Sequence, residues 1–302
     1  MPSHSPPGLH TVYGLTVETW VPFPELQRAR RDAAVDAVFR LGNVPAELPG
    51  CAKRGARFQT APGRLLVWLD NVARYLIADG REIVVQPDDG ATEGDLRLFL
   101  LCSPMGGLLL QRGCLPLHAS AVATERGAVV FMGPSGAGKS TLAACFQRRG
   151  LRPMADDISV IHFAPDGAPW VMPGLPQFKL WPDAVERLGS AADDLARLRP
   201  QIEKRAFPLR EGFHAEPMPL ERIYILRIGG RRELESLAGM DKLPQLLRNT
   251  YRAQFVPGLG LASSHFGAVS RLAQAAGMTL VSRTMDEGPD SVADRIAADL
   301  GV

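Results

Sequence analysis

A glycine-rich segment at residues 133–140 has the spacing of a phosphate-binding loop. It reads GPSGAGKS and so satisfies the pattern G-x-x-x-x-G-K-[ST]. In such a loop backbone N–H groups converge on phosphate oxygens, the lysine reaches the β- and γ-phosphates, and the hydroxyl binds Mg²⁺. We therefore predict a nucleotide-binding site, with Ser140 on the metal, formed by Gly133, Pro134, Ser135, Gly136, Ala137, Gly138, Lys139, Ser140 and Thr141.

Two adjacent carboxylates, Asp156 and Asp157, follow the segment expected to form the helix after this loop. Such a pair beside a Mg²⁺-nucleotide suits phosphoryl transfer to a hydroxyl, because one carboxylate supports the metal and the other accepts the hydroxyl proton. The alternative is an ordinary surface turn. His118 precedes the loop by one strand-turn-strand unit, so a hairpin would return it beside the phosphates. A histidine in an apolar strand is, however, more often a core residue.

Nucleotide-driven motors carry a further acidic strand that this chain does not offer. The apolar segment ERIYILRIGG, downstream of the loop, has Arg227 where such a strand would end in aspartate. The sequences LSGGQ and NKxD are also absent. The run LLVWLD ends in Asp70 but precedes the loop, and we interpret it as the end of a strand.

Elements that alternate between strand and helix must position these residues. From Cys114 onward the pattern predicts α/β architecture, with strands at 127–132 and 278–284, a helix from Ser140, and an amphipathic helix at 184–199. Residues 12–87 are instead short apolar or alternating runs, with a hairpin predicted at Asp79-Gly80. We predict a β-rich N-terminal domain over 1–95 and a P-loop catalytic domain over 96–302.

Composition bounds the classes of partner. The 302 residues are 46% hydrophobic and 22% charged, which excludes disordered and collagen-like chains. The formal net charge of +2 is too small to attract the whole protein to nucleic acid or to an anionic membrane. The four cysteines form no CxxC pair, so we expect neither a zinc site nor a disulfide framework, and a cytoplasmic location. We find no signal peptide or membrane span. Monomer and homo-oligomer both remain open.

Three segments together resemble the C-terminal catalytic domain of HPr kinase/phosphorylase: LPLHASAV, GPSGAGKST and QRRGLRPMADD. Members of that family are P-loop serine kinases with a fold like that of phosphoenolpyruvate carboxykinase. The resemblance implies that ATP and Mg²⁺ are used and that His118 is catalytic. It also implies that Asp157 takes the proton of the acceptor serine.

The chain departs from this family at residues 173–189, where Lys179 stands at the centre and no glutamate matches the family's acidic metal ligand. The segments GLPQFKLWP, KRAFPL and VYGLTVETWVPFPEL are more similar to the HPr-kinase-related proteins of lasso-peptide biosynthesis, kinases that phosphorylate the C-terminal serine of the precursor peptide. Lys179, Lys204 and Arg205 are then candidates to contact the transferred phosphoryl group or an acidic peptide end. A solvated surface is the alternative for each.

The leading hypothesis is therefore an ATP- and Mg²⁺-dependent kinase acting on a serine of a peptide, with Asp157 as base, Lys139 and Ser140 on phosphates and metal, and Asp156 supporting Mg²⁺. A serine kinase of a folded HPr-type phosphocarrier is the second hypothesis. A nucleotide-sensing module without catalysis is the third, and a kinase of free serine or another small molecule also stays open.

Overall fold

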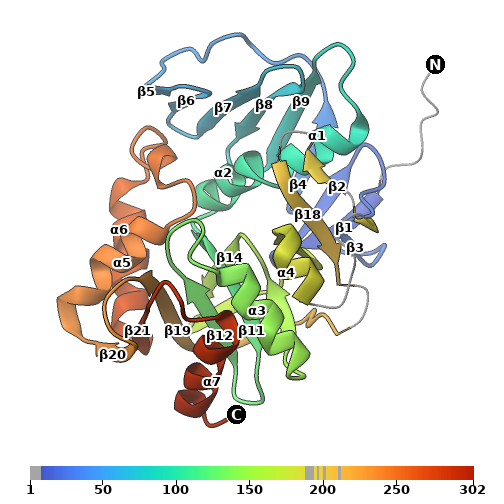
Figure 1. Cartoon of the computed structure of the whole chain (residues 1–302). Coiled ribbons are helices and arrows are strands. Elements are labelled where there is room, and N and C mark those ends of the chain that lie inside the picture. Colours follow the sequence, from blue (N-terminus) through green and yellow to red (C-terminus); the bar gives the residue numbers. More distant parts are fainter. Residues whose placement is uncertain (1–7, 188–193, 196, 200–201, 210–211) are drawn as a thin grey trace. The chain divides into compact units, whose positions relative to one another are not determined.

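The structure is a computed structural model that describes residues 8–187, 194–195, 197–199, 202–209 and 212–302, apart from the side chains of 183, 187, 197–199, 202 and 204. The chain folds as two compact units (Figure 1). The first unit contains Met1–Pro116 and Tyr251–Ala268, and the second contains Leu117–Thr250 and Val269–Val302. The sequence-based division at residue 95 stays a prediction, because the units are defined by contacts and the first of them includes a segment distant in sequence.

The first unit is built on a nine-stranded sheet with the order β3-β1-β2-β4-β9-β8-β7-β6-β5. Its strands are β1 Gly8–Val12, β2 Leu15–Thr19, β3 Gln27–Arg28, β4 Ala37–Leu41, β5 Lys53–Gly55, β6 Phe58–Ala61, β7 Arg64–Leu69, β8 Ala73–Ala78 and β9 Glu82–Pro87. The helices α1 Glu93–Leu100 and α2 Ser103–Gln111 follow, and Thr92 caps α1 by accepting a hydrogen bond from Asp95 N. The short runs between residues 12 and 87 thus form strands, as the sequence indicates.

The predicted hairpin is present between β8 and β9, where Ala78 faces Glu82. Asp79 and Gly80 have φ values of 52° and 65°, both in the left-handed region. A type I′ turn requires positive φ at both central residues, which aspartate tolerates and glycine adopts without strain. Asp70 lies directly after β7 and is exposed, so it is a strand end as expected.

Parallel strands position the functional residues of the second unit. Strand β12 pairs in parallel with β19, and β19 pairs in parallel with β21. The strands that follow β9, outside the small sheet below, are β10 Leu115–Leu117, β11 Ala119–Ala123, β12 Ala128–Met132, β13 Arg152–Ala155, β14 Ser159–Phe163, β15 Pro169–Met172, β19 Met218–Ile228, β20 Glu233–Leu237 and β21 Met278–Arg283. Because carboxyl ends of parallel strands meet at one edge of a sheet, the residues after Met132, Ile228 and Arg283 share that edge.

A small sheet, β16-β18-β17, adds to this unit. Its strands are β16 Gln177–Leu180, β17 Arg197–Arg199 and β18 Ile202–Pro208. The helices are α3 Lys139–Arg148, α4 Pro182–Arg187, α5 Lys242–Asn249, α6 Ala262–Ala275, which begins in the first unit, and α7 Pro289–Leu300; the 3-10 turns η2 Gly239–Asp241 and η3 Ala253–Phe255 complete the elements. Within the described residues, no helix has the length and apolar content to span a membrane.

The helix predicted over 184–199 is wrong at residues 197–199. Helix α4 covers Pro182–Arg187, whereas residues 197–199 form the strand β17, which pairs antiparallel with β18. Residues 188–193 and 196 lie outside the described part of the chain. Backbone pairing with β18 outweighs the local helical pattern, because helix propensity is a weak preference that tertiary contacts override.

The core of the second unit lies between β12, α3 and α7. The rings of Phe131 and Phe146 stack at 5.3 Å with an interplanar angle of 10°, and both side chains are buried. Val292 and Ile296 of α7 belong to the same buried cluster. This packing fixes the start of α3 against the end of β12, and so sets the conformation of the loop that joins them.

Candidate active site

The loop between β12 and α3 requires glycine at defined positions. Gly133 has φ 142°, and a Cβ built there would lie 2.6 Å from the carbonyl oxygen of Leu226, which is backbone and cannot move aside cheaply. Gly138, the residue before α3, has φ 99°. The N–H of Gly133 donates to Oδ1 of Asn249 at 3.1 Å, which holds the loop to the end of α5. The sequence pattern therefore folds as the strand-loop-helix unit that a phosphate site needs.

Lys139, the first residue of α3, is 7% exposed. Its Nζ donates to the carbonyl oxygens of Gly133 at 2.9 Å and Pro134 at 3.1 Å. The carbonyl groups of the loop thus hold the ammonium group of Lys139 at the edge of the loop. A buried cation in this position, together with the N-terminal end of a helix, attracts phosphate oxygens.

The loop forms one wall of a cavity of about 160 Å³, which we call the Asp157 pocket. Its lining residues come from four separate segments and are His118, Ser135, Gly136, Gly138, Lys139, Ser140, Thr141, Asp157, Lys179 and Trp181. The structure thus brings the predicted catalytic residues to the predicted phosphate loop. His118 lies in the link between β10 and β11. The hairpin that follows it leads into the loop, and this hairpin was expected to bring His118 beside the loop.

Asp157 occupies the link between β13 and β14 with φ 69°, a left-handed conformation that is uncommon for a residue with a side chain. Its Oδ2 accepts a hydrogen bond from Lys179 Nζ at 2.7 Å. The Nδ1 atom of His118 lies 3.0 Å from the carbonyl oxygen of Asp157 and 3.4 Å from its Oδ1. Histidine, carboxylate and ammonium therefore form one polar cluster beside the loop.

The electrostatics of this cluster keep Asp157 ionised. Burial raises the pKa of its carboxyl, but the Lys179 ammonium and the hydrogen bond from His118 lower that pKa by more, so it lies well below its usual range. The side chain is 24% exposed, and one carboxylate oxygen remains within reach of a ligand in the pocket. Asp157 is therefore an anion near neutral pH.

Asp156 has a different environment, although it is adjacent. Its side chain is buried, its Oδ1 accepts from Ser120 Oγ at 2.6 Å, and its Oδ2 accepts from the backbone N–H of Lys179 at 2.8 Å. It does not line the Asp157 pocket. Asp156 thus ties β16 to β11 and holds Lys179 in place, while its expected role on Mg²⁺ stays a prediction.

Strand β16 delivers two side chains to the pocket by its alternation. Phe178 and Leu180 are fully buried in the core, so Lys179 and Trp181 belong to the opposite face. Both line the Asp157 pocket, and Trp181 is 47% exposed. Sequence reasoning identified Lys179 but missed Trp181, for which the signal was its two-residue spacing from Lys179.

The remaining cationic candidates lie on β18. Arg205 is buried, faces Leu180 of β16 across the small sheet, and donates from Nη1 to the carbonyl oxygen of Glu203 at 2.5 Å. It is not among the residues that line the Asp157 pocket. Lys204 belongs to the same strand, and its side chain lies outside the described residues. Their roles toward a substrate stay predictions.

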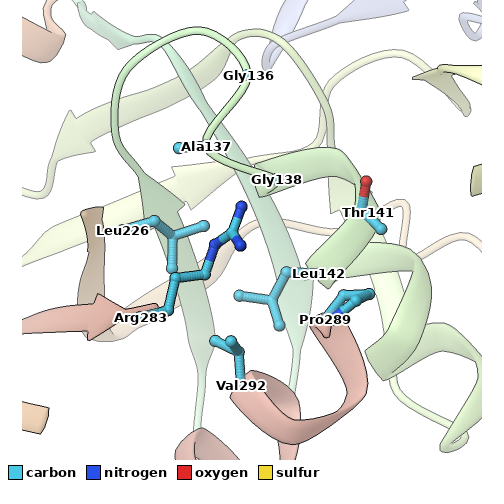
Figure 2. Close-up of a pocket in the computed structure, with 9 residues that line it drawn as sticks. All are labelled: Gly136, Ala137, Gly138, Thr141, Leu142, Leu226, Arg283, Pro289 and Val292. Carbon is cyan, nitrogen blue, oxygen red and sulfur yellow. The ribbon is translucent and has the colours of Figure 1, made fainter. Parts of the chain in front are cut away.

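A second cavity, of about 190 Å³, also borders the loop (Figure 2). We call it the Arg283 pocket, and it is lined by Gly136, Ala137, Gly138, Thr141, Leu142, Leu226, Arg283, Pro289 and Val292. It shares Gly136, Gly138 and Thr141 with the Asp157 pocket. Sequence reasoning missed Arg283, because nothing in its local pattern distinguishes it from a surface arginine.

The polar groups of the Asp157 pocket fit Mg²⁺ bound to a nucleotide. Among the residues that the structure describes, no group of three or more His, Cys, Asp or Glu could hold a metal by itself. Mg²⁺ does not need such a cage, because it is usually bound by one or two carboxylates together with substrate phosphates. The Ser140 hydroxyl lines this pocket and can supply a ligand next to the phosphates, and the Asp157 carboxylate lines the same pocket.

The lowered pKa of Asp157 makes the stability of the protein depend on pH. In the unfolded chain the carboxyl titrates near about pH 3.9, and in the folded protein below that value. A lowered pKa contributes stability that is present above pH ~4 and is lost as the pH falls toward the folded pKa. We expect urea unfolding to show the free energy of unfolding of the wild type falling relative to that of Asp157→Asn as the pH decreases below ~4. A difference between the two proteins that stays constant from pH ~4 down to pH ~2 would contradict the assignment.

Comparison with protein-family models finds no match, and comparison with curated proteins finds none. Among solved structures, the chain is similar to the Hpr(Ser) kinase/phosphatase from Coxiella burnetii, with 8% sequence identity and a TM-score of 0.32. The match covers 62% of this chain and 99% of the other. At this identity and TM-score the likeness adds nothing to what the residues of the site indicate.

Proposed function

We propose that this protein is a kinase that transfers the γ-phosphoryl group of ATP to a serine hydroxyl of a peptide. The observation that carries the proposal is the Asp157 pocket, in which Lys139 and Ser140 of the phosphate loop face Asp157, His118 and Lys179. Phosphoryl transfer needs groups that bind and neutralise phosphate charge next to a carboxylate that orients the attacking hydroxyl. Both kinds of group line this one cavity.

In the proposed reaction the serine oxygen attacks the γ-phosphorus, the bond from that phosphorus to the bridging β-γ oxygen breaks, and ADP leaves. The hydroxyl proton passes to the Asp157 carboxylate. A carboxylate with a lowered pKa is a weak base, but the transition state of phosphoryl transfer is loose, so the proton moves late and the main task of the base is orientation. Lys179, hydrogen-bonded to Asp157, and His118, close to it, hold the carboxylate in one position.

Positively charged groups in the pocket would bind the phosphates of the nucleotide. Lys139 is presented by the loop carbonyls, and the start of α3 adds the partial charge of its N–H groups. Mg²⁺, held by Ser140 together with the phosphates, would neutralise charge on the transferred group. Segment 173–189 has no glutamate that matches the acidic metal ligand of the HPr kinase family, and Lys179 at its centre supplies an ammonium group to the pocket.

The acceptor class rests on sequence. The motifs around His118, the loop and Asp157 resemble those of serine kinases, and the segments at 174–182 and 204–209 resemble kinases of lasso-peptide precursors. We therefore propose the C-terminal serine of such a precursor peptide as the acceptor.

Intact-mass spectrometry tests the proposal. A peptide ending in serine and, separately, a folded HPr phosphocarrier are incubated with the protein and Mg²⁺-ATP. We expect the peptide to gain the mass of one phosphoryl group and the same peptide ending in alanine to gain none. A gain on HPr alone would replace the acceptor by a folded carrier. Tight ATP binding with no gain on either would favour a nucleotide-sensing module.

A further inference from the structure

The Arg283 pocket continues the Asp157 pocket along the phosphate loop, because both use Gly136, Gly138 and Thr141. A polyphosphate bound along the loop with its transferred end beside Asp157 therefore has its other end directed into the Arg283 pocket. The position agrees with the topology of the sheet. Arg283 is the last residue of β21, at the carboxyl edge of the parallel strands, where ligands of such sheets bind.

Arg283 presents a positive charge to this cavity. Figure 2 shows its guanidinium group extending between Leu142 and Leu226 toward the loop at Gly136–Gly138. Nη1 donates to the carbonyl oxygen of Glu287 at 3.3 Å, which uses one of the five N–H donors of the group. Among the described residues, no carboxylate forms an ion pair with Arg283. The nearby Glu287 carboxylate is held by Arg295 at 3.1 Å instead.

The backbone of Gly136–Gly138 borders the cavity, and most of its other side chains are apolar. Leu142 of α3, Leu226 of β19 and Val292 of α7 are nearly fully buried and line it together with Pro289. Apart from Arg283, the lining offers one polar side chain, Thr141, which also lines the Asp157 pocket. Bases are told apart by hydrogen bonds to their edges, whereas apolar contacts distinguish them weakly.

We propose that Arg283 binds a non-transferred phosphate of the nucleotide and that the apolar part of its pocket accepts the base by contact alone. The site then selects a nucleoside triphosphate by its polyphosphate, and it binds ATP, GTP and CTP alike. This inference rests on the proposed function, since it assumes that the loop binds a nucleotide.

Isothermal titration calorimetry of the full chain with ATP, GTP, CTP and inorganic tripolyphosphate tests it. Wild type is compared with Arg283→Gln and with Arg232→Gln. The second variant removes an exposed arginine that contacts Thr284, Asp286 and, at 3.9 Å, the Glu287 carboxylate, and these three residues do not line the pocket. We expect the three nucleotides to bind wild type within about fivefold of one another. We expect Arg283→Gln to weaken ATP and tripolyphosphate by about tenfold each, because a charge-assisted hydrogen bond is lost in both, and Arg232→Gln to change neither.

Each of the other outcomes contradicts a defined part of the inference. A loss for ATP but not for tripolyphosphate would place Arg283 on the nucleoside rather than on a phosphate. A preference of a hundredfold or more for one nucleotide would show that the base is read. Nucleotide binding that Arg283→Gln leaves unchanged would refute the inference alone, whereas a wild type that binds no nucleotide would refute the proposed function as well. The thermal midpoints of the variants, compared with wild type, confirm that each is folded.

Discussion

Replacing Asp157 by asparagine is expected to lower the rate of phosphoryl transfer by about a thousandfold, within the range of a lost general base, and to leave the affinity for nucleotide within about threefold. The amide matches the carboxylate in size but neither accepts the serine proton nor carries charge. The backbone conformation survives, because asparagine tolerates the left-handed φ of 69° found at this position. Single-turnover phosphorylation and calorimetry measure the two effects separately.

The control for this variant is Asp166→Asn. Asp166 is an exposed turn residue of the same unit whose Oδ1 accepts from the backbone N–H of Ala168 at 2.9 Å, away from the pocket. It should transfer phosphate at the wild-type rate. If Asp157→Asn also did so, Asp157 would not be the base, and the pocket would need another group to orient the hydroxyl.

Replacing Lys139 by methionine is expected to weaken nucleotide binding by about a hundredfold and to reduce transfer further. Methionine keeps the length and the apolar stem of the buried side chain, but it removes the charge that faces the phosphates and leaves the carbonyls of Gly133 and Pro134 without their donor. Hydrogen bonds to charged groups contribute about 1.5–3 kcal/mol each, so the loss of one or two phosphate contacts gives this magnitude. Calorimetry with ATP measures the binding term.

Lys242→Met is the matched control. Lys242 Nζ also donates to two backbone carbonyls, those of Ala273 at 3.0 Å and Ala276 at 2.8 Å, but it does not line the pockets at the loop. Its replacement should destabilise the fold by a similar amount without affecting nucleotide affinity. Equal losses of affinity in both variants would mean that Lys139 acts through stability alone.

The features that the sequence predicted correctly depend on local pattern. Positive φ at Asp79 and Gly80 follows from the residues themselves, and so does the strand-loop-helix unit around Gly133 and Lys139. The position of His118 beside the glycine-rich loop needed only the short hairpin that precedes the loop. In each case the relevant neighbours are close in the chain.

The features that the sequence missed depend on contacts between distant segments. The pairing of Asp157 with Lys179 and the hydrogen bonds of Asp156 to Ser120 and Lys179 arise when β16 packs beside β13 and β11. The position of Arg283 in its pocket depends on the parallel pairing of β21 with β19, and no local sequence motif predicts that pairing. The error at residues 197–199 has the same origin, since β18 recruits that segment as a strand.

A crystal structure with Mg²⁺ and a non-hydrolysable ATP analogue tests the central claim most directly. The account predicts that the γ-phosphate lies in the Asp157 pocket, contacted by Lys139 and facing the Asp157 carboxylate, with Mg²⁺ on Ser140. A γ-phosphate turned away from Asp157, or an analogue bound elsewhere than at the loop, would contradict it.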